Sequence, residues 1–151
     1  MDVYDLKILE ELQNDAKTST AELGRIIGLS TTATKERVKK LEQEGIIKEY
    51  TAVINSKAVG VGLIAFITVP VGDISILDMG EFLVGLGEVQ EVHKVTGDTC
   101  FFIKAKVKDA ADLENLVDNI NRHAKNTYTY LVLSTLKETN KIQINQSTEL
   151  S

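Results

Sequence analysis

The sequence predicts an α+β protein with an N-terminal helix-turn-helix domain and a C-terminal ferredoxin-like βαββαβ domain. Three observations predict it. Apolar residues in the first fifty positions recur at helical spacing, residues 62–138 alternate between strand-like and helix-like patterns, and four cations gather between Thr31 and Leu41 in a chain of net charge -5.

Composition sets the broad class. The chain has 151 residues, 43% hydrophobic and 26% charged, which is typical of an ordered globular protein. Its longest apolar run, Val59–Val71, contains Gly and Pro and is too short to span a bilayer, so we expect a cytoplasmic protein without membrane contact. A single cysteine and two histidines predict no intramolecular disulfide, metal site or cofactor.

The first two helices follow from apolar spacing and capping residues. Leucines recur every three residues in a helix that should run to about Asp15, at Leu6, Leu9 and Leu12. Ser19 with Glu22 three residues later is a capping-box start for a second helix. Gly28 can adopt the left-handed conformation that ends a helix, and Gly24 would let this helix cross the next one closely.

A third helix should begin after Ser30 or Thr31, either of which can cap it, and end at Gly45. Its inner face is expected to hold Thr34, Val38 and Leu41. The residues that point away from that face are Thr32, Lys35, Glu36 and Lys39, with Thr31, Arg37 and Lys40 on its flanks. Two helices joined by a short turn with glycine predict a helix-turn-helix.

This third helix has the residues of a recognition helix, with hydroxyls at its N-terminal end and cations further along. We predict that it binds double-stranded DNA through Ser30, Thr31, Thr32, Lys35, Arg37, Lys39 and Lys40. A solvated lysine-rich surface is the alternative interpretation, which the preceding capped helix and the turn glycine disfavour. Because residues 1–50 carry net charge -2 and residues 51–151 carry -3, only a local patch can meet a polyanion.

After Gly45, the apolar residues recur at a spacing different from that of the first three helices. Ile46–Asn55 is rich in β-branched residues and predicts a strand that leaves the helical unit, followed by a flexible linker. The predicted βαββαβ order comprises strand 63–71, helix 74–86, strands 89–95 and 99–107, helix 110–124 and strand 127–135. The predicted organisation is therefore a DNA-binding domain at 1–50, a hinge strand and linker at 51–61, a second domain at 62–138 and a tail at 139–151.

Self-association is predicted from the second domain. In the segments TCFFIKAKV and TYTYLVLST neither alternate set of positions is purely polar, which favours a sheet covered on both faces. Two helices can cover one face. A second copy of the chain would cover the other, giving a homodimer or a multiple of it.

Four segments together resemble the Lrp/AsnC family of transcription regulators: MDVYDLKILEELQNDAKTS, LSTTATKERVKKLEQEGIIKEYTAVIN, VQEVHKVTGD and TYLVLSTLKE. The resemblance runs from about Asp2 to Glu138. It implies a winged-helix-like DNA reader and a ferredoxin-like domain that dimerises and often builds tetramers or octamers. It also implies an amino-acid or related effector beside the turn Thr96, Gly97 and Asp98.

The chain departs from the family pattern at two positions. Cys100 stands where the family usually has a second aspartate of the effector site, and Thr34 stands where it has valine or isoleucine. A hydroxyl bond to the preceding turn could accommodate Thr34. Without the resemblance, a tight hairpin turn is the favoured explanation of the Thr-Gly-Asp segment.

Other functions are disfavoured by the motifs. The segment GVGLIA is followed by a strand rather than the helix that a dinucleotide site needs. No nucleophile elbow, phosphate loop or paired catalytic acid appears, so an enzyme is not expected. The competing functions are a metabolite sensor that acts through a protein partner and a weakly specific architectural DNA-binding protein.

Overall fold

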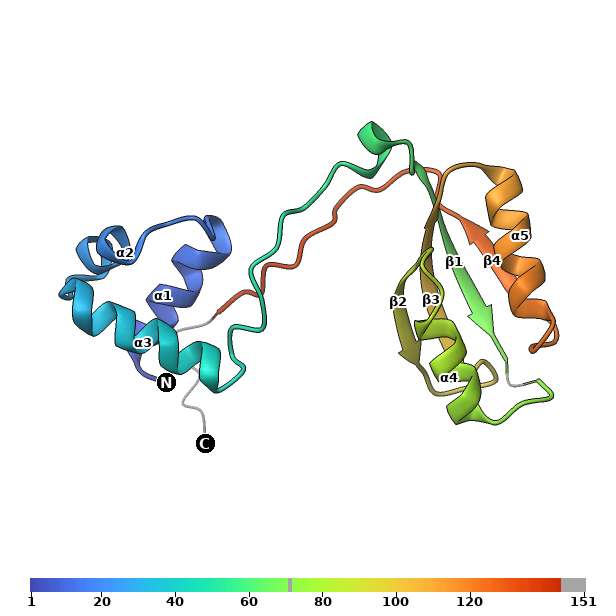
Figure 1. The fold of residues 1–151 in the computed structure, drawn as a ribbon, viewed down its shortest axis with the longest axis horizontal. Coiled ribbons are helices and arrows are strands. Elements are labelled where there is room, and N and C mark those ends of the chain that lie inside the picture. The colour runs from blue at the N-terminus through green and yellow to red at the C-terminus, as the bar shows by residue number, and fades with distance from the viewer. Residues whose placement is uncertain (71, 145–151) are drawn as a thin grey trace. The chain divides into compact units, whose positions relative to one another are not determined.

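The computed structural model describes residues 1–70 and 72–144. It divides into two compact units, one formed by Met1–Val53 with residues 138–144, and the other by Ile54–Lys137 (Figure 1). The units divide after Val53, whereas the sequence predicted a DNA-binding domain at 1–50 and a hinge strand and linker at 51–61. Residues 139–144, the described part of the predicted tail, belong to the first unit.

The first unit holds three helices, α1 (Val3–Asn14), α2 (Thr20–Ile27) and α3 (Thr31–Gln43). Their shared core is formed by Ile8, Ile27 and Leu41, with five partly buried apolar side chains packed around them. Such a small core leaves the unit dependent on well-formed helix ends.

Each helix start is capped by a polar side chain. The Ser19 and Ser30 hydroxyls accept hydrogen bonds from the backbone N–H groups of Glu22 and Ala33, both at 3.2 Å, which confirms the predicted starts. The reciprocal capping box lies instead on α1, where the Asp2 carboxylate accepts from Asp5 N–H at 3.1 Å and the Asp5 carboxylate accepts from Asp2 N–H at 2.9 Å.

The predicted hinge strand is not a strand in this chain. Residues 48–55 are extended without a β-ladder partner among the described residues. A strand needs a neighbouring edge to bond, and the described part of the chain offers none here. The segment is attached to α3 through the Tyr50 hydroxyl, which donates to Glu42 Oε1 at 2.9 Å. Partial burial and this contact raise the pKa of Tyr50 to about 12.

The prediction of a flexible linker is also wrong in part, because Ser56–Val59 forms a 3-10 turn.

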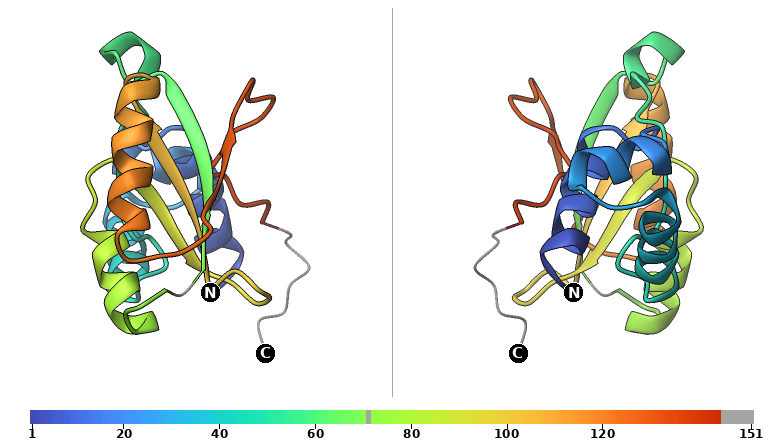
Figure 2. Two further views of the ribbon diagram at one scale, coloured as in Figure 1. Left: turned by 90° about the vertical axis from the view of Figure 1, so that its right-hand side faces the viewer. Right: turned by 90° about the vertical axis from the view of Figure 1, so that its left-hand side faces the viewer.

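The second unit is an antiparallel sheet of four strands, β1 (Leu63–Val69), β2 (Val89–Lys94), β3 (Phe101–Val107) and β4 (Tyr128–Leu131), in the order β2-β3-β1-β4. Two helices, α4 (Ile76–Val84) and α5 (Ala110–Asn121), lie on one face of it (Figure 2, left). The predicted βαββαβ arrangement is confirmed. Strand β4 is shorter than predicted, because its ladder partner β1 begins at Leu63 and the last bond joins Val132 N–H to the Ile64 carbonyl.

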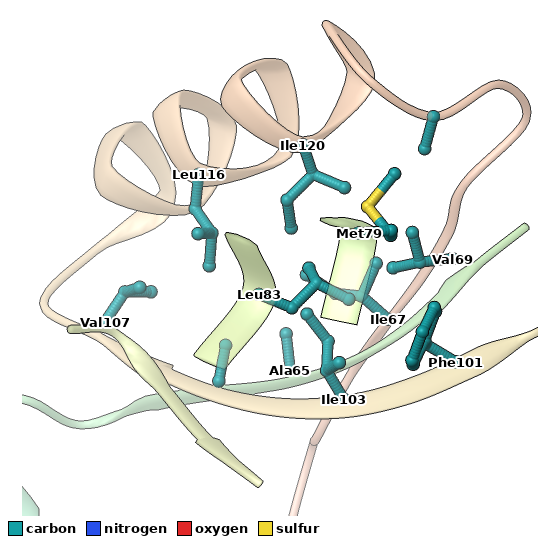
Figure 3. Packing of buried hydrophobic residues seen from close by; sticks show 12 residues of the cluster. Ala65, Ile67, Val69, Met79, Leu83, Phe101, Ile103, Val107, Leu116 and Ile120 are labelled. Atoms are coloured by element: carbon teal, nitrogen blue, oxygen red, sulfur yellow. The ribbon is translucent and has the colours of Figure 1, made fainter. Parts of the chain in front are cut away.

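The main core lies between the sheet and the two helices (Figure 3). Alternate residues of β1 and β3 face it, so both strands bury every second side chain. Helix α4 contributes Met79 and Leu83, and α5 contributes Leu116 and Ile120. This alternation aims the remaining side chains of β1 and β3 at the uncovered face of the sheet.

The C-terminal segment is held to α1. The Gln13 side chain makes a paired contact with Ile142, whose N–H donates to Gln13 Oε1 at 2.6 Å while Gln13 Nε2 donates to the Ile142 carbonyl at 3.1 Å. Lys141 Nζ donates to Asn14 Oδ1 at 3.1 Å. These contacts explain why the tail belongs to the first unit.

Candidate functional site

The first candidate site is the outer surface of α3. The helix is fixed against α2 at Gly24, where a Cβ atom would lie 2.7 Å from the Leu29 carbonyl oxygen and 3.0 Å from Thr34 Oγ1. Thr34 is fully buried and its hydroxyl donates to the Ser30 carbonyl at 2.9 Å, as predicted. The two helices therefore cross in close contact at this glycine.

An exposed stripe runs along the opposite side of α3, formed by Thr31, Thr32, Lys35 and Lys39. Spacings of three and four residues place these side chains on one helix face. The stripe begins at the N-terminus of α3, where the helix dipole favours anions. We call it the α3 stripe. Its hydroxyls and ammonium groups are suited to a phosphate backbone and to base edges.

Three other predicted contact residues, Ser30, Arg37 and Lys40, have partners within the unit. The Ser30 hydroxyl caps α3, and Lys40 Nζ lies 3.8 Å from Glu44 Oε1 in an exposed ion pair. Glu36 is exposed beside the α3 stripe and would repel phosphates. At this position, the Glu36 carboxylate could accept a hydrogen bond from the amino group of a cytosine.

Arg37 is placed differently from the prediction. Its Nη1 atom lies 2.8 Å from Asp2 Oδ2 and 2.7 Å from Asp5 Oδ1, and its guanidinium carbon lies 5.4 Å from the centre of the Tyr4 ring. The side chain thus joins α3 to the start of α1. Sequence reasoning missed this role because the partners are distant along the chain, with Asp5 32 residues away.

Arg37 and the Asp2 carboxyl shift each other's pKa. Partial desolvation opposes ionisation of Asp2, but hydrogen bonds from the Asp5 and Tyr4 N–H groups and the Arg37 charge outweigh it and lower the pKa of that carboxyl. Hydrogen bonds to Asp5 and Asp2 raise the pKa of Arg37. Asp5 is buried. Its carboxylate accepts the capping hydrogen bond from Asp2 N–H and also pairs with Arg37.

The second candidate site is the turn between β2 and β3. Val95 N–H donates to the Cys100 carbonyl at 2.9 Å and closes the turn. At its tip, Thr96, Gly97 and Asp98 are exposed, and Gly97 has φ +105° with open space around its α-carbon. Glycine suits this backbone conformation, which side chains rarely adopt. Cys100 is only partly exposed and packs against the main core, unlike the three tip residues.

The third candidate site is the face of the sheet opposite α4 and α5. Phe66 and Phe102 stack there with ring centroids 5.5 Å apart, beside Tyr128 and Tyr130, which are 63% and 57% exposed. The Thr68 hydroxyl on the same face is buried and has no hydrogen-bond partner in the described part of the chain. An aromatic surface of this kind is typical of a protein interface.

A charged group borders this aromatic surface. Glu91 lies 3.1 Å from His93 Nε2 and 3.3 Å from Lys104 Nζ. The hydrogen bond with His93 contributes most to lowering the pKa of Glu91, and Lys104 acts in the same direction against partial desolvation.

In residues 1–70 and 72–144, no helix is long and apolar enough to cross a membrane, and no three His, Cys, Asp or Glu side chains could together hold a metal ion.

Comparison with known proteins covers both units. A family model for winged helix-turn-helix DNA-binding domains matches residues 1–48, and a model for the Lrp/AsnC ligand binding domain matches residues 64–142. The chain is 36% identical to the HTH-type transcriptional regulator FL11 of Pyrococcus horikoshii, over 95% of this chain and 97% of that protein. It is 33% identical to the leucine-responsive regulatory protein of Escherichia coli K12, over 95% of this chain and 92% of the relative.

A solved structure resembles the chain over nearly its whole length. It is the L-Met complex of the transcriptional regulator NMB0573 from Neisseria meningitidis, with a TM-score of 0.88 and 27% identity, covering 96% of this chain and 97% of that one. The order of elements and their pairing are therefore shared with a regulator that was crystallised with an amino acid.

Proposed function

Because the chain belongs to the Lrp/AsnC family of DNA-binding transcription regulators, we propose that the α3 stripe is its DNA-contacting surface, that the open sheet face forms its dimer, and that the turn at Gly97 and Asp98 binds its effector. The observation that carries the first assignment is the exposure of Thr31, Thr32, Lys35 and Lys39 on the second helix of the helix-turn-helix.

The α3 stripe suits insertion into a major groove. Thr31 and Thr32 lie at the N-terminal end, which enters a groove first in helix-turn-helix proteins, and the two lysines follow one and two turns later. Lys40 lies on the flank, where its weak ion pair with Glu44 is readily exchanged for a phosphate. Arg37 is left out of the proposed contacts, because two carboxylates already neutralise it.

Dimerisation through the sheet would cover the aromatic surface. Phe66, Phe102 and the two exposed tyrosines would be removed from water, and the Thr68 hydroxyl would gain access to a partner. A two-fold dimer presents two α3 helices. The expected operator is a pseudo-palindrome with half-sites about one DNA turn, roughly 34 Å, or a multiple of it apart.

An α-amino acid is the ligand class proposed for the turn. Backbone N–H groups beside Gly97 can bind a carboxylate without obstruction from a side chain, and Asp98 can accept from an ammonium group. The methionine seen with the Neisseria meningitidis regulator supports this class. Cys100 does not supply the second carboxylate expected from the family, so Asp98 is the proposed acidic contact.

Footprinting of the DNA upstream of the protein's own gene tests the main proposal. We expect protection of two half-sites on the same side of the duplex, lost on changing Lys35 and Lys39 together to Ala. Equal protection of all sequences at moderate salt would instead identify a weakly specific architectural protein. Protection that survives the double change would remove the α3 stripe from the interface.

A further inference from the structure

Glu36 is an acidic side chain in the middle of the outer surface of α3. Helical geometry places it opposite Thr34 and Leu41, which are buried on the inner face. Along the helix it lies between Thr32, four residues earlier, and Lys39, three residues later, so the three side chains are neighbours. A duplex that receives the α3 stripe in its major groove therefore meets a carboxylate at the centre of the contact.

The Glu36 carboxylate makes no hydrogen bond or ion pair in residues 1–70 and 72–144. Lys40 lies four residues later, at a spacing that favours such a pair, but its Nζ atom lies 3.8 Å from Glu44 Oε1 instead. The second acid of α3, Glu42, accepts from the Tyr50 hydroxyl. Glu36 is thus the acid of this helix whose oxygens are open to the edge of a DNA base.

A carboxylate at the centre of a DNA contact is unfavourable unless a donor meets it. It repels the phosphates on both sides of the groove, and it loses water when the groove is filled. The charges of Lys35 and Lys39 offset part of the repulsion, but neither ammonium group bonds to Glu36 in the structure. A hydrogen-bond donor on the DNA would offset the remaining cost.

The bases differ in what they offer a carboxylate, which can only accept hydrogen bonds. In the major groove, guanine presents acceptors and thymine presents an acceptor and a methyl group, whereas adenine has an acceptor next to its amino donor. Cytosine presents its N4 amino donor without an acceptor of its own. A C·G pair is therefore the base pair that best satisfies Glu36.

We propose that Glu36 is a specificity-determining residue that recognises a cytosine in each half-site of the operator, with its carboxylate accepting a hydrogen bond from the cytosine N4 amino group. The inference rests on the proposed DNA contact of the α3 stripe. The lysines of the stripe supply affinity through phosphates, which carry no sequence information. Glu36 adds discrimination between sequences.

Selection from a library of randomised duplexes tests this role with the full-length protein. The wild type should enrich duplexes with a cytosine at a fixed place in each half-site. Glu36→Gln should replace that cytosine by adenine, because glutamine can bond to both N6 and N7 of adenine. Glu36→Ala should accept any base there. Glu10→Gln, which removes the same charge from an exposed position on α1, should retain the cytosine.

Fluorescence anisotropy with the selected duplex measures the size of the effect. Changing the C·G pair to T·A should weaken wild-type binding about tenfold and Glu36→Ala binding by less than about twofold. If the Glu36 variants bind every duplex more tightly with unchanged base preferences, Glu36 only repels phosphates and the proposal is wrong.

Failure of the proposed DNA contact gives a different result. In that case, changing Lys35 and Lys39 together to Ala would leave the affinity for the selected duplex unchanged, and both proposals would be wrong. If the double change weakens binding but Glu36→Gln and Glu36→Ala still select cytosine, the α3 stripe contacts DNA and only the role of Glu36 is refuted.

Discussion

Gly24 and Thr34 meet where α2 crosses α3. A methyl group on Gly24 would lie 3.0 Å from the Thr34 hydroxyl oxygen and 2.7 Å from the Leu29 backbone oxygen, both too short for an ordinary contact. Since Leu29 lies in the turn between the helices, backbone rather than a flexible side chain would have to move. The angle at which α3 is presented therefore depends on one absent side chain.

Gly24→Ala should destabilise the first unit by about 1–3 kcal/mol, because the added methyl group forces the turn and α3 away from α2. Urea unfolding followed by far-UV circular dichroism measures it. Gly87→Ala serves as the control, since nothing lies within 4 Å of a Cβ atom there. If Gly24→Ala lowers the free energy of unfolding no more than Gly87→Ala does, α2 and α3 can shift at their crossing without loss of stability.

Lys39→Ala should lower the slope of log affinity against log salt by about 0.9, the value for one phosphate contact. Filter binding or fluorescence anisotropy over a range of salt concentrations gives the slope. Lys125→Ala removes the same charge from an exposed site on the other unit and should leave the slope unchanged. Arg37→Ala should reduce stability rather than the slope, because Arg37 pairs with Asp2 and Asp5.

The first unit should lose stability in acid partly through Asp2. Its folded-state pKa is lowered, so its contribution is present above the unfolded-state value near 3.8 and is lost as pH falls through the folded-state pKa. Asp2→Asn keeps a good N-cap but has no charge to lose. The melting temperature should therefore fall less steeply between pH 7 and pH 3 for Asp2→Asn than for the wild type. Parallel curves would assign the acid sensitivity to other groups.

Phe102→Asp should convert the sheet-face dimer to a monomer, because it places a charge beside Phe66 in the centre of the aromatic surface. Sedimentation equilibrium measures the dissociation constant, which we expect to rise by two or more orders of magnitude, about 3 kcal/mol. Far-UV circular dichroism establishes that the variant remains folded. A folded variant that stays dimeric would move the dimer contact to another surface.

Asp98→Ala should abolish effector binding without changing dimerisation. A thermal-shift screen of amino acids identifies the ligand, and a compound at 100 times its dissociation constant should stabilise the wild type by about 2.7 kcal/mol. Asp118→Ala, an exposed acid on α5, should retain the shift. If no amino acid raises the melting temperature at millimolar concentration, the turn serves only to join β2 and β3.

The sequence by itself determined the features that depend on neighbouring residues. Ser19, Ser30, Gly28 and Gly45 mark helix ends because a cap or a left-handed glycine acts within a few residues. The segments TCFFIKAKV and TYTYLVLST, in which neither alternate set of positions is purely polar, predicted a sheet covered on both faces. The order of strand-like and helix-like segments predicted the βαββαβ fold. Thr34 was placed correctly on the inner face of α3 because helical spacing alone fixes that face.

Only the tertiary structure decided what depends on distant residues. Arg37 looked like one more cation of a DNA-contacting helix until folding brought Asp2 and Asp5 beside it. Ile46–Asn55 has the composition of a strand but finds no edge to pair with among residues 1–70 and 72–144, because hydrogen bonding in a sheet requires a partner that composition cannot supply. The tail came to lie on α1 for the same reason, since the Gln13 amide pairs with Ile142 only after the chain has returned across 129 residues.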